Sequence, residues 1–223
     1  MPKSKVGVTL RIEVRDDKGR VVKVIETPSR SFTQNFANIL AASMWSMNSI
    51  SGLNNIYTFY DVMGNQICVV GSASPPSYCY LSLKDVGILF YSEPQYIASQ
   101  YQSYTISMPG IWPGVAFCPE PVYAYGPCSP ISTSVLSPTL FIFPSSPVYT
   151  TSGWQMSYSQ TWTNATSSPV VVSSVALVFG MTGDPYTPNV YFLYAAIVDN
   201  VTPAVVINPG YSVTFTYTLL YAV

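Results

Sequence analysis

The N-terminal segment alternates between apolar and polar residues and then turns back on itself. Its alternating apolar positions are Val6, Val8, Leu10, Ile12 and Val14. A period of two residues is typical of a strand with one buried face. Residues 16–19 are turn formers that include Gly19, and an apolar return run over residues 21–25 ends at Pro28. The pattern predicts a β-hairpin over residues 6–26.

The next segment has the pattern of a helix. Ser31 and Gln34 have the spacing of a capping box, in which each side chain bonds the backbone N–H of the other residue. Apolar residues then recur at helical spacing through about residue 47: Phe32, Phe36, Ile39, Leu40, Met44 and Met47. The alternative is a helix lying on a membrane surface, but the segment lacks the basic polar face of such helices. We therefore expect it to pack over one end of a sandwich.

From residue 51 onward the chain has the pattern of a β protein. Short apolar runs alternate with clusters of Pro, Gly, Ser and Asn. The clearest strands cover residues 154–162, 171–179, 190–198 and 213–221, with turn sequences between them. We therefore expect an all-β fold, a jelly-roll-type antiparallel β-sandwich with one short N-terminal helix.

We expect the chain of 223 residues to form a single domain, because it contains no fixed-period repeat and no flexible Gly/Ser linker. Within this domain, residues 1–50 form the basic hairpin and the helix. Residues 71–150 contain 12 of the 19 prolines and half of the 18 tyrosines. Because proline cannot donate a hydrogen bond to a β-ladder, this region should consist of ordered loops and edge strands that form interfaces.

Charged residues are rare and gather at one end of the chain. They make up 9% of the residues, against about 25% in an average soluble domain. Residues 1–30 contain eight basic residues and four acids, whereas residues 31–223 contain one lysine and six acids. The basic end suits an acidic partner, anionic lipid or nucleic acid, and the alternative is a solvated hairpin kept soluble by its charges. The candidate partner-contact residues are Arg11, Arg15, Lys18, Arg20 and Lys23.

The sequence offers little for catalysis or for nucleic-acid recognition. It contains no histidine, which excludes Ser-His-Asp and Cys-His nucleophiles and His-ligated zinc. The acids beyond residue 30 lie far apart in the sequence, and no Gly-rich nucleotide-binding loop is present. Basic residues are not interleaved with the aromatic residues after residue 30. We therefore expect no enzyme activity, no cofactor, no metal and no specific nucleic-acid partner.

No secretory signal is visible, and no apolar run is long enough to cross a bilayer, so we expect a chain that is soluble once released.

Four cysteines and two sequons are the remaining candidate sites. The spacings from Cys68 to Cys79 and from Cys118 to Cys128 match neither zinc ribbons nor redox motifs. They are compatible with two local disulfides or with buried free cysteines. Two Asn-X-Thr sequons at predicted turns begin at Asn164 and Asn200, and these residues are candidate glycosylation sites where they are exposed.

Segments at both ends of the chain carry a resemblance. The run from Ser29 to Phe32 opening a helix, the hairpin before it, and the terminal strand from Asn208 to Thr218 resemble a pattern of virus and phage structural proteins. The length, the Tyr/Pro/Ser-rich composition and the missing histidine are similar to those of the vertex (penton-base or turret) structural proteins of the Sulfolobus turreted icosahedral virus, which infects hyperthermophilic archaea.

This resemblance implies a jelly-roll capsid subunit in the virion, assembled as a homopentamer at the five-fold vertex. It further implies contacts with the major capsid protein, with a turret or neighbouring vertex protein, and with the internal viral membrane or its membrane protein. The alternative function is a host-attachment or glycan-binding head on a viral or cell-surface appendage. Such a head would use exposed aromatic residues, such as Trp112 or Tyr125, as stacking platforms.

Overall fold

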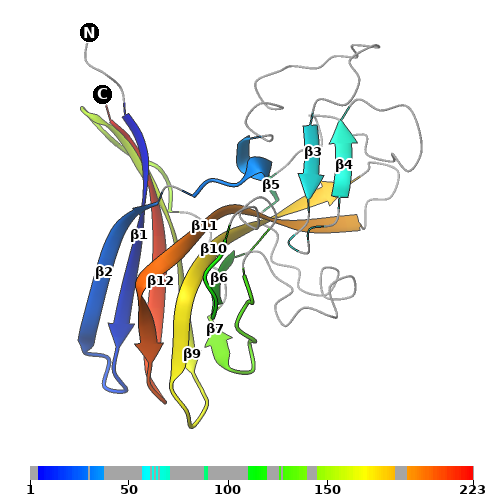
Figure 1. The fold of residues 1–223 in the computed structure, drawn as a ribbon. Helices are drawn as coiled ribbons and strands as arrows, with labels where there is room; N and C mark the ends of the chain where they lie inside the picture. Colours follow the sequence, from blue (N-terminus) through cyan, green and yellow to red (C-terminus); the bar gives the residue numbers. More distant parts are fainter. Residues whose placement is uncertain are drawn as a thin grey trace.

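The computed structural model describes residues 5–29, 31–37, 57–60, 62, 64, 66–70, 88–89, 110–119, 126, 128–139, 145–183 and 190–222. The described residues form twelve strands and one helical turn over residues 34–37. The strands lie in two main antiparallel sheets and one separate hairpin, as Figure 1 shows.

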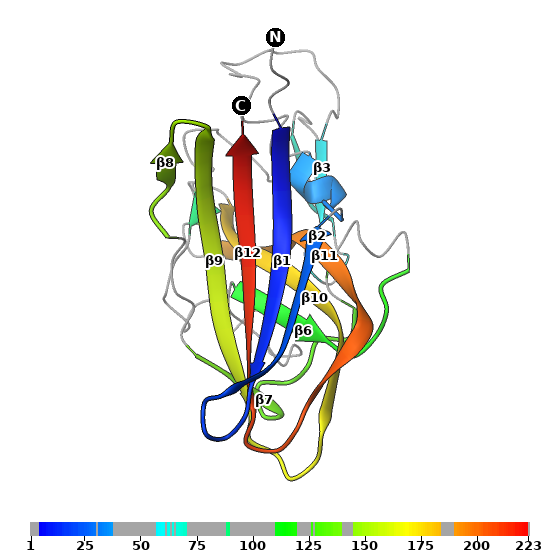
Figure 2. The same cartoon turned by 90° about the vertical axis from the view of Figure 1, so that its left-hand side faces the viewer.

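The larger sheet has six strands and brings the first and last strands of the chain together. Its strands are β1 (Lys5–Arg15), β2 (Val21–Ser29), β7 (Leu136–Pro138), β8 (Val148–Thr150), β9 (Gly153–Asn164) and β12 (Ser212–Ala222). The order is β2-β1-β12-β9-β7, and β8 pairs with the first residues of β9. β1 and β12 pair along their full length and stand side by side in the middle of the sheet (Figure 2).

The smaller sheet has four strands around a central β10. Its strands are β5 (Ile88–Leu89), β6 (Gly110–Gly114), β10 (Val170–Gly183) and β11 (Val190–Ile207). β10 pairs with β11 on one side and with β5 and β6 on the other. Residues 201–204 form a bulge in β11, since Val172 pairs with Val205 and Ser174 pairs with Asn200. The separate hairpin consists of β3 (Tyr57–Tyr60) and β4 (Gln66–Val70).

The two main sheets share one hydrophobic core, which confirms the predicted all-β sandwich. The core residues of the larger sheet lie at alternate positions, as predicted for the hairpin and the closing strand: Val8, Leu10, Ile12, Val14, Tyr158, Trp162, Val213, Phe215 and Tyr217. Burying each large apolar side chain contributes about 1.5–3 kcal/mol. The described strands do not establish jelly-roll connectivity, which stays a prediction, as does the single-domain organisation.

The structure corrects the predicted start of the helix. Ser31 pairs with β11, where its carbonyl oxygen accepts a backbone hydrogen bond of 3.0 Å. Thr33 caps the helical turn instead, because its Oγ1 accepts the N–H of Phe36 at 3.3 Å. The predicted capping box of Ser31 and Gln34 is therefore wrong, and the physical reason is the pairing with β11. The rest of the predicted helix, residues 38–47, lies outside the described residues.

A disulfide joins Cys118 to Cys128, whose Cα atoms are 5.2 Å apart. Both cysteines are buried, and they connect the residues after β6 to the residues before β7. Of the second predicted pair, Cys79 lies outside the described residues, and only the backbone of Cys68 is described, in β4. Within the proline-rich region 71–150, the described residues form β5 to β8 and the segments beside them.

Candidate functional site

The turn of the N-terminal hairpin is held by the carboxylate of Asp16. Its Oδ1 accepts the backbone N–H groups of Lys18 (3.0 Å) and Arg20 (2.9 Å), and its Oδ2 accepts the Nε–H of Arg20 at 2.7 Å. Gly19 supplies the positive φ of 76° that the turn requires. Desolvation by burial opposes ionisation of Asp16, but the hydrogen bonds from Arg20 and Lys18 outweigh it. The pKa of Asp16 is therefore lowered.

On the outer face of β1, one carboxylate binds two arginines. Arg11 Nη2 lies 2.7 Å from Glu13 Oε2, and Arg15 forms a salt bridge with Glu13 Oε1. Arg15 also donates from Nη1 to the carbonyl oxygen of Gly19 at 2.9 Å. The hydrogen bonds from Arg11 and Arg15 lower the pKa of Glu13. Glu13 thus fixes the two guanidinium groups, whose side chains remain 48% and 45% exposed.

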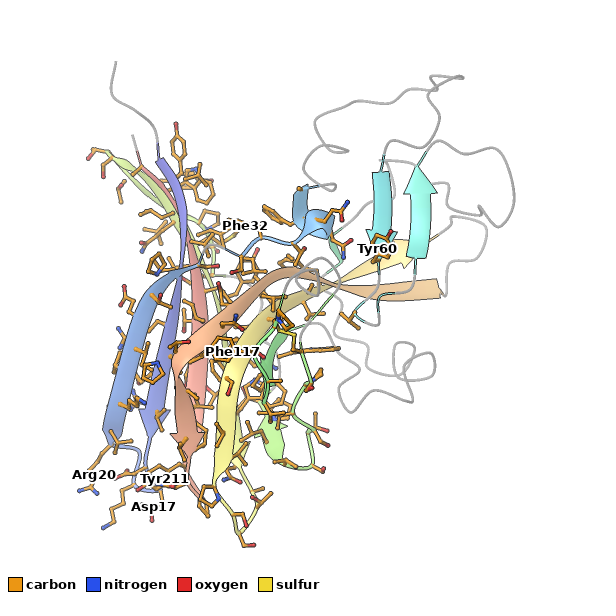
Figure 3. The ribbon with its side chains drawn as sticks, in the orientation of Figure 1. Asp17, Arg20, Phe32, Tyr60, Phe117 and Tyr211 are labelled. Atoms are coloured by element: carbon orange, nitrogen blue, oxygen red, sulfur yellow. A yellow bond between two sulfur atoms is a disulfide. The ribbon has the colours of Figure 1, made fainter. Side chains whose placement is uncertain are left out.

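The five predicted contact residues therefore fall into two groups. Arg11, Arg15 and Arg20 have carboxylate partners within the hairpin. Lys18 and Lys23 are exposed and form no ion pair within the part of the chain that the structure describes. Arg15 and Arg20 bond groups of the turn, and Arg11 bonds Glu13 within β1, whereas the two lysines are left without such partners among the described residues. Figure 3 shows Arg20 and Asp17 at the tip, near Tyr211 of the neighbouring turn.

The sequence contained a signal for this division. Two of the arginines stand two positions from Glu13 on the same strand face, and Arg20 follows Asp16 by four residues across a turn.

β2 is the outermost strand of the larger sheet and carries apolar side chains at its edge. Val21, Val22 and Val24 are 46%, 52% and 46% exposed. Within the described residues, β2 pairs with β1 alone. An unpaired edge with exposed valines is a template for contact with another chain, while the bulge near its start and Pro28 limit open-ended pairing. We call Lys18, Val21, Val22, Lys23 and Val24 the hairpin edge.

The outer face of β9 and β12 is covered by hydroxyl groups. Three cross-strand pairs form hydrogen bonds: Ser157 with Thr218 (3.0 Å), Ser159 with Thr216 (2.8 Å) and Thr161 with Thr214 (2.7 Å). The register continues onto β1, where Arg11 and Glu13 lie opposite two of these threonines. Figure 2 looks onto this face. These pairs keep the sheet surface polar without adding charge. In the sequence, Ser and Thr residues at alternate positions of the two strands indicated a polar outer face.

The structure contradicts Asn164 as a glycosylation site. Its side chain is 0% exposed. Nδ2 donates to the carbonyl oxygens of Ser168 (2.9 Å) and Ile207 (2.8 Å), and Oδ1 accepts the backbone N–H (2.9 Å) and the hydroxyl (2.7 Å) of Thr166. Both hydrogens of the amide are therefore used inside the protein. Asn164 instead joins the turn over residues 165–168 to the end of β11.

Asn200 lies in β11 beside its bulge, which corrects the prediction of a turn at this position. Its Oδ1 accepts the backbone N–H of Cys118 at 2.9 Å, and the side chain is half-buried. The side chain thus holds one end of the disulfide loop against the smaller sheet. Glycosylation of Asn200 stays a prediction.

Trp112 is only 1% exposed, which contradicts its predicted role as a stacking platform. It lies in β6 opposite Ala176 of β10, so its side chain belongs to the core. Tyr125 lies outside the described residues. Other aromatic side chains of the described part are exposed: Phe32 is 42%, Phe117 is 57% and Tyr149 is 77% exposed. Phe32 and Phe117 are labelled in Figure 3.

The described residues contain one acid beyond the hairpin, Asp199, and it is buried. It lies beside Tyr217, whose hydroxyl donates to the carbonyl oxygen of Val175 at 3.1 Å. Burial, with the charge of Asp199 and a hydrogen bond to it, raises the pKa of Tyr217 well above its usual value. Over the described ranges, no group of three or more Cys, Asp or Glu side chains is placed to hold a metal ion. No helix in the same ranges has the length and apolarity to span a membrane.

No family model, no curated protein and no solved structure matches this chain. The resemblance to viral vertex proteins therefore stays a prediction, and so do the partners that it implies.

Proposed function

We propose that this chain is a structural subunit of an icosahedral virus particle, located at the five-fold vertex as a penton-base or turret component and assembled as a homopentamer. The observation that carries the proposal is the hairpin edge. Its three half-exposed valines and Lys23 lie on a strand edge that the described residues leave unpaired, and Lys18 lies in the adjoining turn. Neither lysine forms an ion pair within those residues. Exposed apolar surface beside charge is the kind of surface that a subunit buries on assembly.

The charge distribution supports a contact between unlike surfaces. A closed ring requires one surface of each subunit to meet a different surface of the next. Eight basic residues against four acids give residues 1–30 a net charge of +4, and one lysine against six acids gives residues 31–223 a net charge of −5. A hairpin edge placed against the acidic part of a neighbour gains electrostatic complementarity, which fixes orientation and speeds association.

The remaining partners are proposed from the resemblance. They are the major capsid protein, a turret or neighbouring vertex protein, and the internal membrane or its membrane protein. The low charge content and the paired hydroxyls of β9 and β12 suit a subunit whose faces are covered by such neighbours.

The test is a double charge reversal, K18E/K23E, in particles. Because these lysines have no carboxylate partner in the described part of the chain, the variant should keep its melting temperature and lose most of its copies per purified particle. Gln155→Glu and Ser137→Glu, at exposed positions of the same sheet, are the matched controls and should assemble normally. Normal incorporation of K18E/K23E would show that the hairpin edge is not part of the subunit interface.

Cryo-electron microscopy of the five-fold vertex tests the assignment itself. We expect five copies around the axis. Absence of the chain from purified particles would overturn the vertex function, whatever the behaviour of the variant.

A further inference from the structure

Three charged side chains lie at successive outward positions of β1. Arg11, Glu13 and Arg15 are two residues apart, so they share the outer face of the larger sheet. Glu13 lies between the two arginines and gives one carboxylate oxygen to each of them. Its Oε2 lies 2.7 Å from Arg11 Nη2, and its Oε1 forms the salt bridge with Arg15. We call Arg11 and Arg15 the guanidinium pair.

The guanidinium pair is more exposed than the carboxylate that it binds. The side chains of Arg11 and Arg15 are 48% and 45% exposed, whereas that of Glu13 is 15% exposed. Arg15 is held a second time by the turn, because its Nη1 donates to the carbonyl oxygen of Gly19 at 2.9 Å. Both guanidinium groups are therefore accessible from solvent while Glu13 and the turn fix their positions.

The neighbouring strands place mainly uncharged residues around the guanidinium pair. The residues opposite Arg11, Glu13 and Arg15 in the two ladders are Thr216, Thr214 and Ser212 on β12 and Glu26, Val24 and Val21 on β2. Glu26, opposite Arg11, is the charged residue among these six. In the turn, Asp16 is bonded to Arg20, and Asp17 and Lys18 are the further charged groups. Within the described residues, Glu13 is the carboxylate that contacts both members of the pair.

A carboxylate that bridges two arginines uses the same donors that a phosphate or sulfate group uses. Guanidinium N–H groups bind carboxylates and phosphates in the same way, through charge-assisted hydrogen bonds. Two oxygens of a tetrahedral oxyanion fit where the two carboxylate oxygens of Glu13 lie, with one oxygen on each arginine. Glu13 therefore competes with an external oxyanion for the guanidinium pair.

We propose that the guanidinium pair is a binding site for a phosphate or sulfate oxyanion, and that Glu13 closes this site by occupying it from within the chain. The site opens when the carboxylate takes up a proton from water, because the neutral carboxyl no longer neutralises the two guanidinium groups. The arginines keep their charge throughout, since they do not titrate in this range.

The contacts of Glu13 determine the pH at which the site opens. Hydrogen bonds from Arg11 and Arg15 lower the pKa of Glu13 from its usual value of 4.5. The carboxylate therefore keeps the site closed at neutral pH and releases it as the pH falls through the lower, folded pKa. Sulfate and phosphodiester groups remain negatively charged in this range, which makes them the ligands that profit. Neither arginine belongs to the hairpin edge, and the proposal does not depend on the vertex function.

The experiment titrates the full chain with sodium sulfate at constant ionic strength, with chloride as the replaced ion, and follows the arginine Nε–H signals by NMR. At pH 7, Glu13→Gln should bind sulfate at least about tenfold more tightly than the unchanged protein, because it removes the internal charge and keeps the size of the side chain. Glu26→Gln makes the same change in net charge on the same hairpin and should bind like the unchanged protein. Adding Arg11→Gln to Glu13→Gln should abolish the gain.

The unchanged protein gives an independent measurement that needs no variant. Its affinity for sulfate should rise as the pH falls through the titration midpoint of Glu13, which the same NMR spectra report. Circular dichroism at each pH confirms that the chain is folded.

Vesicle flotation at pH 7 distinguishes two sources of the oxyanion. Glu13→Gln that floats with phosphatidylglycerol vesicles, and not with phosphatidylcholine vesicles, would assign the site to the phosphate of an anionic lipid. Sulfate binding without flotation would assign it to a free oxyanion.

Equal affinities of Glu13→Gln and the unchanged protein for sulfate at pH 7 would overturn the proposal. An equally large gain in Glu26→Gln would do the same, because net charge and not the guanidinium pair would then bind the ion. So would a gain that survives Arg11→Gln. Lys18 and Lys23 are unchanged in all of these variants, so the result is separate from the test of the hairpin edge.

Discussion

The side-chain amide of Asn35 forms two hydrogen bonds with the backbone of Tyr60. Its Nδ2 donates to the carbonyl oxygen of Tyr60 at 2.7 Å, and its Oδ1 accepts the N–H of Tyr60 at 3.0 Å. The amide thus replaces the backbone of a neighbouring strand at the end of β3. Asn35 is 0% exposed, so it forms a buried connection between the helical turn and the β3–β4 hairpin.

Asn35→Ala should lower the free energy of unfolding by about 2 kcal/mol, because it removes a fully buried amide and both of its hydrogen bonds to the backbone of Tyr60. Urea unfolding followed by fluorescence measures the loss. Gln34→Ala changes the exposed neighbour in the same helical turn and should have little effect. Equal midpoints for the two variants would contradict the connection.

The two arginines beside Glu13 make the hairpin sensitive to acid. Because the pKa of Glu13 is lower in the folded chain than its usual value of 4.5, the salt bridges stabilise the hairpin fully above about pH 4.5. This contribution is lost as the pH falls through the lower, folded pKa. An NMR titration of the side-chain carboxyl should place the Glu13 midpoint below 4.5.

The matched variants are Glu13→Gln and Glu26→Gln, which replace a paired and an exposed carboxylate of the same hairpin. Glu13→Gln should remove part of the stability loss between pH 4.5 and pH 2, and Glu26→Gln should leave it. A Glu13 midpoint at or above 4.5 would show that the arginines do not stabilise its charged form.

The disulfide between Cys118 and Cys128 should stabilise the chain by about 2–3 kcal/mol, since it closes a short loop in the unfolded state. We expect the C118S/C128S variant to unfold at a lower urea concentration than the oxidised protein. Reductant should move the unchanged protein toward the variant. The variant itself, treated with reductant, controls for effects at the other cysteines. Coincident unfolding curves of the C118S/C128S variant and the oxidised protein would show that the disulfide does not stabilise the chain.

The parts of the fold that were predictable from the sequence are those in which one buried face imposes a period. Leu10 and Phe215 each stand in an alternating run, and a slip of one residue would expose the whole apolar set. The start of the helix was not predictable in this way. Ser31 has the right spacing for a cap, but a bond from Thr33 Oγ1 to Ala195, 162 residues away, fixes the segment against β11.

The candidate site shows the same limit. The basic hairpin was visible in the net charge, and the spacing of Arg11, Glu13 and Arg15 was a signal for the paired arginines, whereas the contacts themselves depend on side-chain geometry. Trp112 was a candidate stacking platform because the sequence alone does not show which side chains are buried. The pairing of β6 with β10 places Trp112 in the core. The placement of Val6, Tyr221, Trp154 and Tyr149 side by side depends on the register of β1, β12, β9 and β8. Local patterns do not determine such a register.

Asn164 belongs to a glycosylation sequon, but in the structure its side chain forms hydrogen bonds within the fold. Asn164→Ala removes a fully buried amide with four hydrogen bonds, so we expect the free energy of unfolding to fall by about 2–4 kcal/mol. Thr166→Ala destroys the same sequon but removes only the hydroxyl, and about 1 kcal/mol should be lost. Ser167→Ala, at the exposed tip of the turn, keeps the sequon and should be neutral.

The modification state of Asn164 checks the same geometry independently. When the chain is expressed through a eukaryotic secretory pathway, peptide mass spectrometry of the folded protein should find Asn164 unmodified. The reason is that its Nδ2 is buried and donates both hydrogens to the carbonyl oxygens of Ser168 and Ile207. A glycan on Asn164 in protein with an unchanged melting temperature would contradict the structure at this corner, because the sugar replaces one amide hydrogen and therefore one of these two buried bonds.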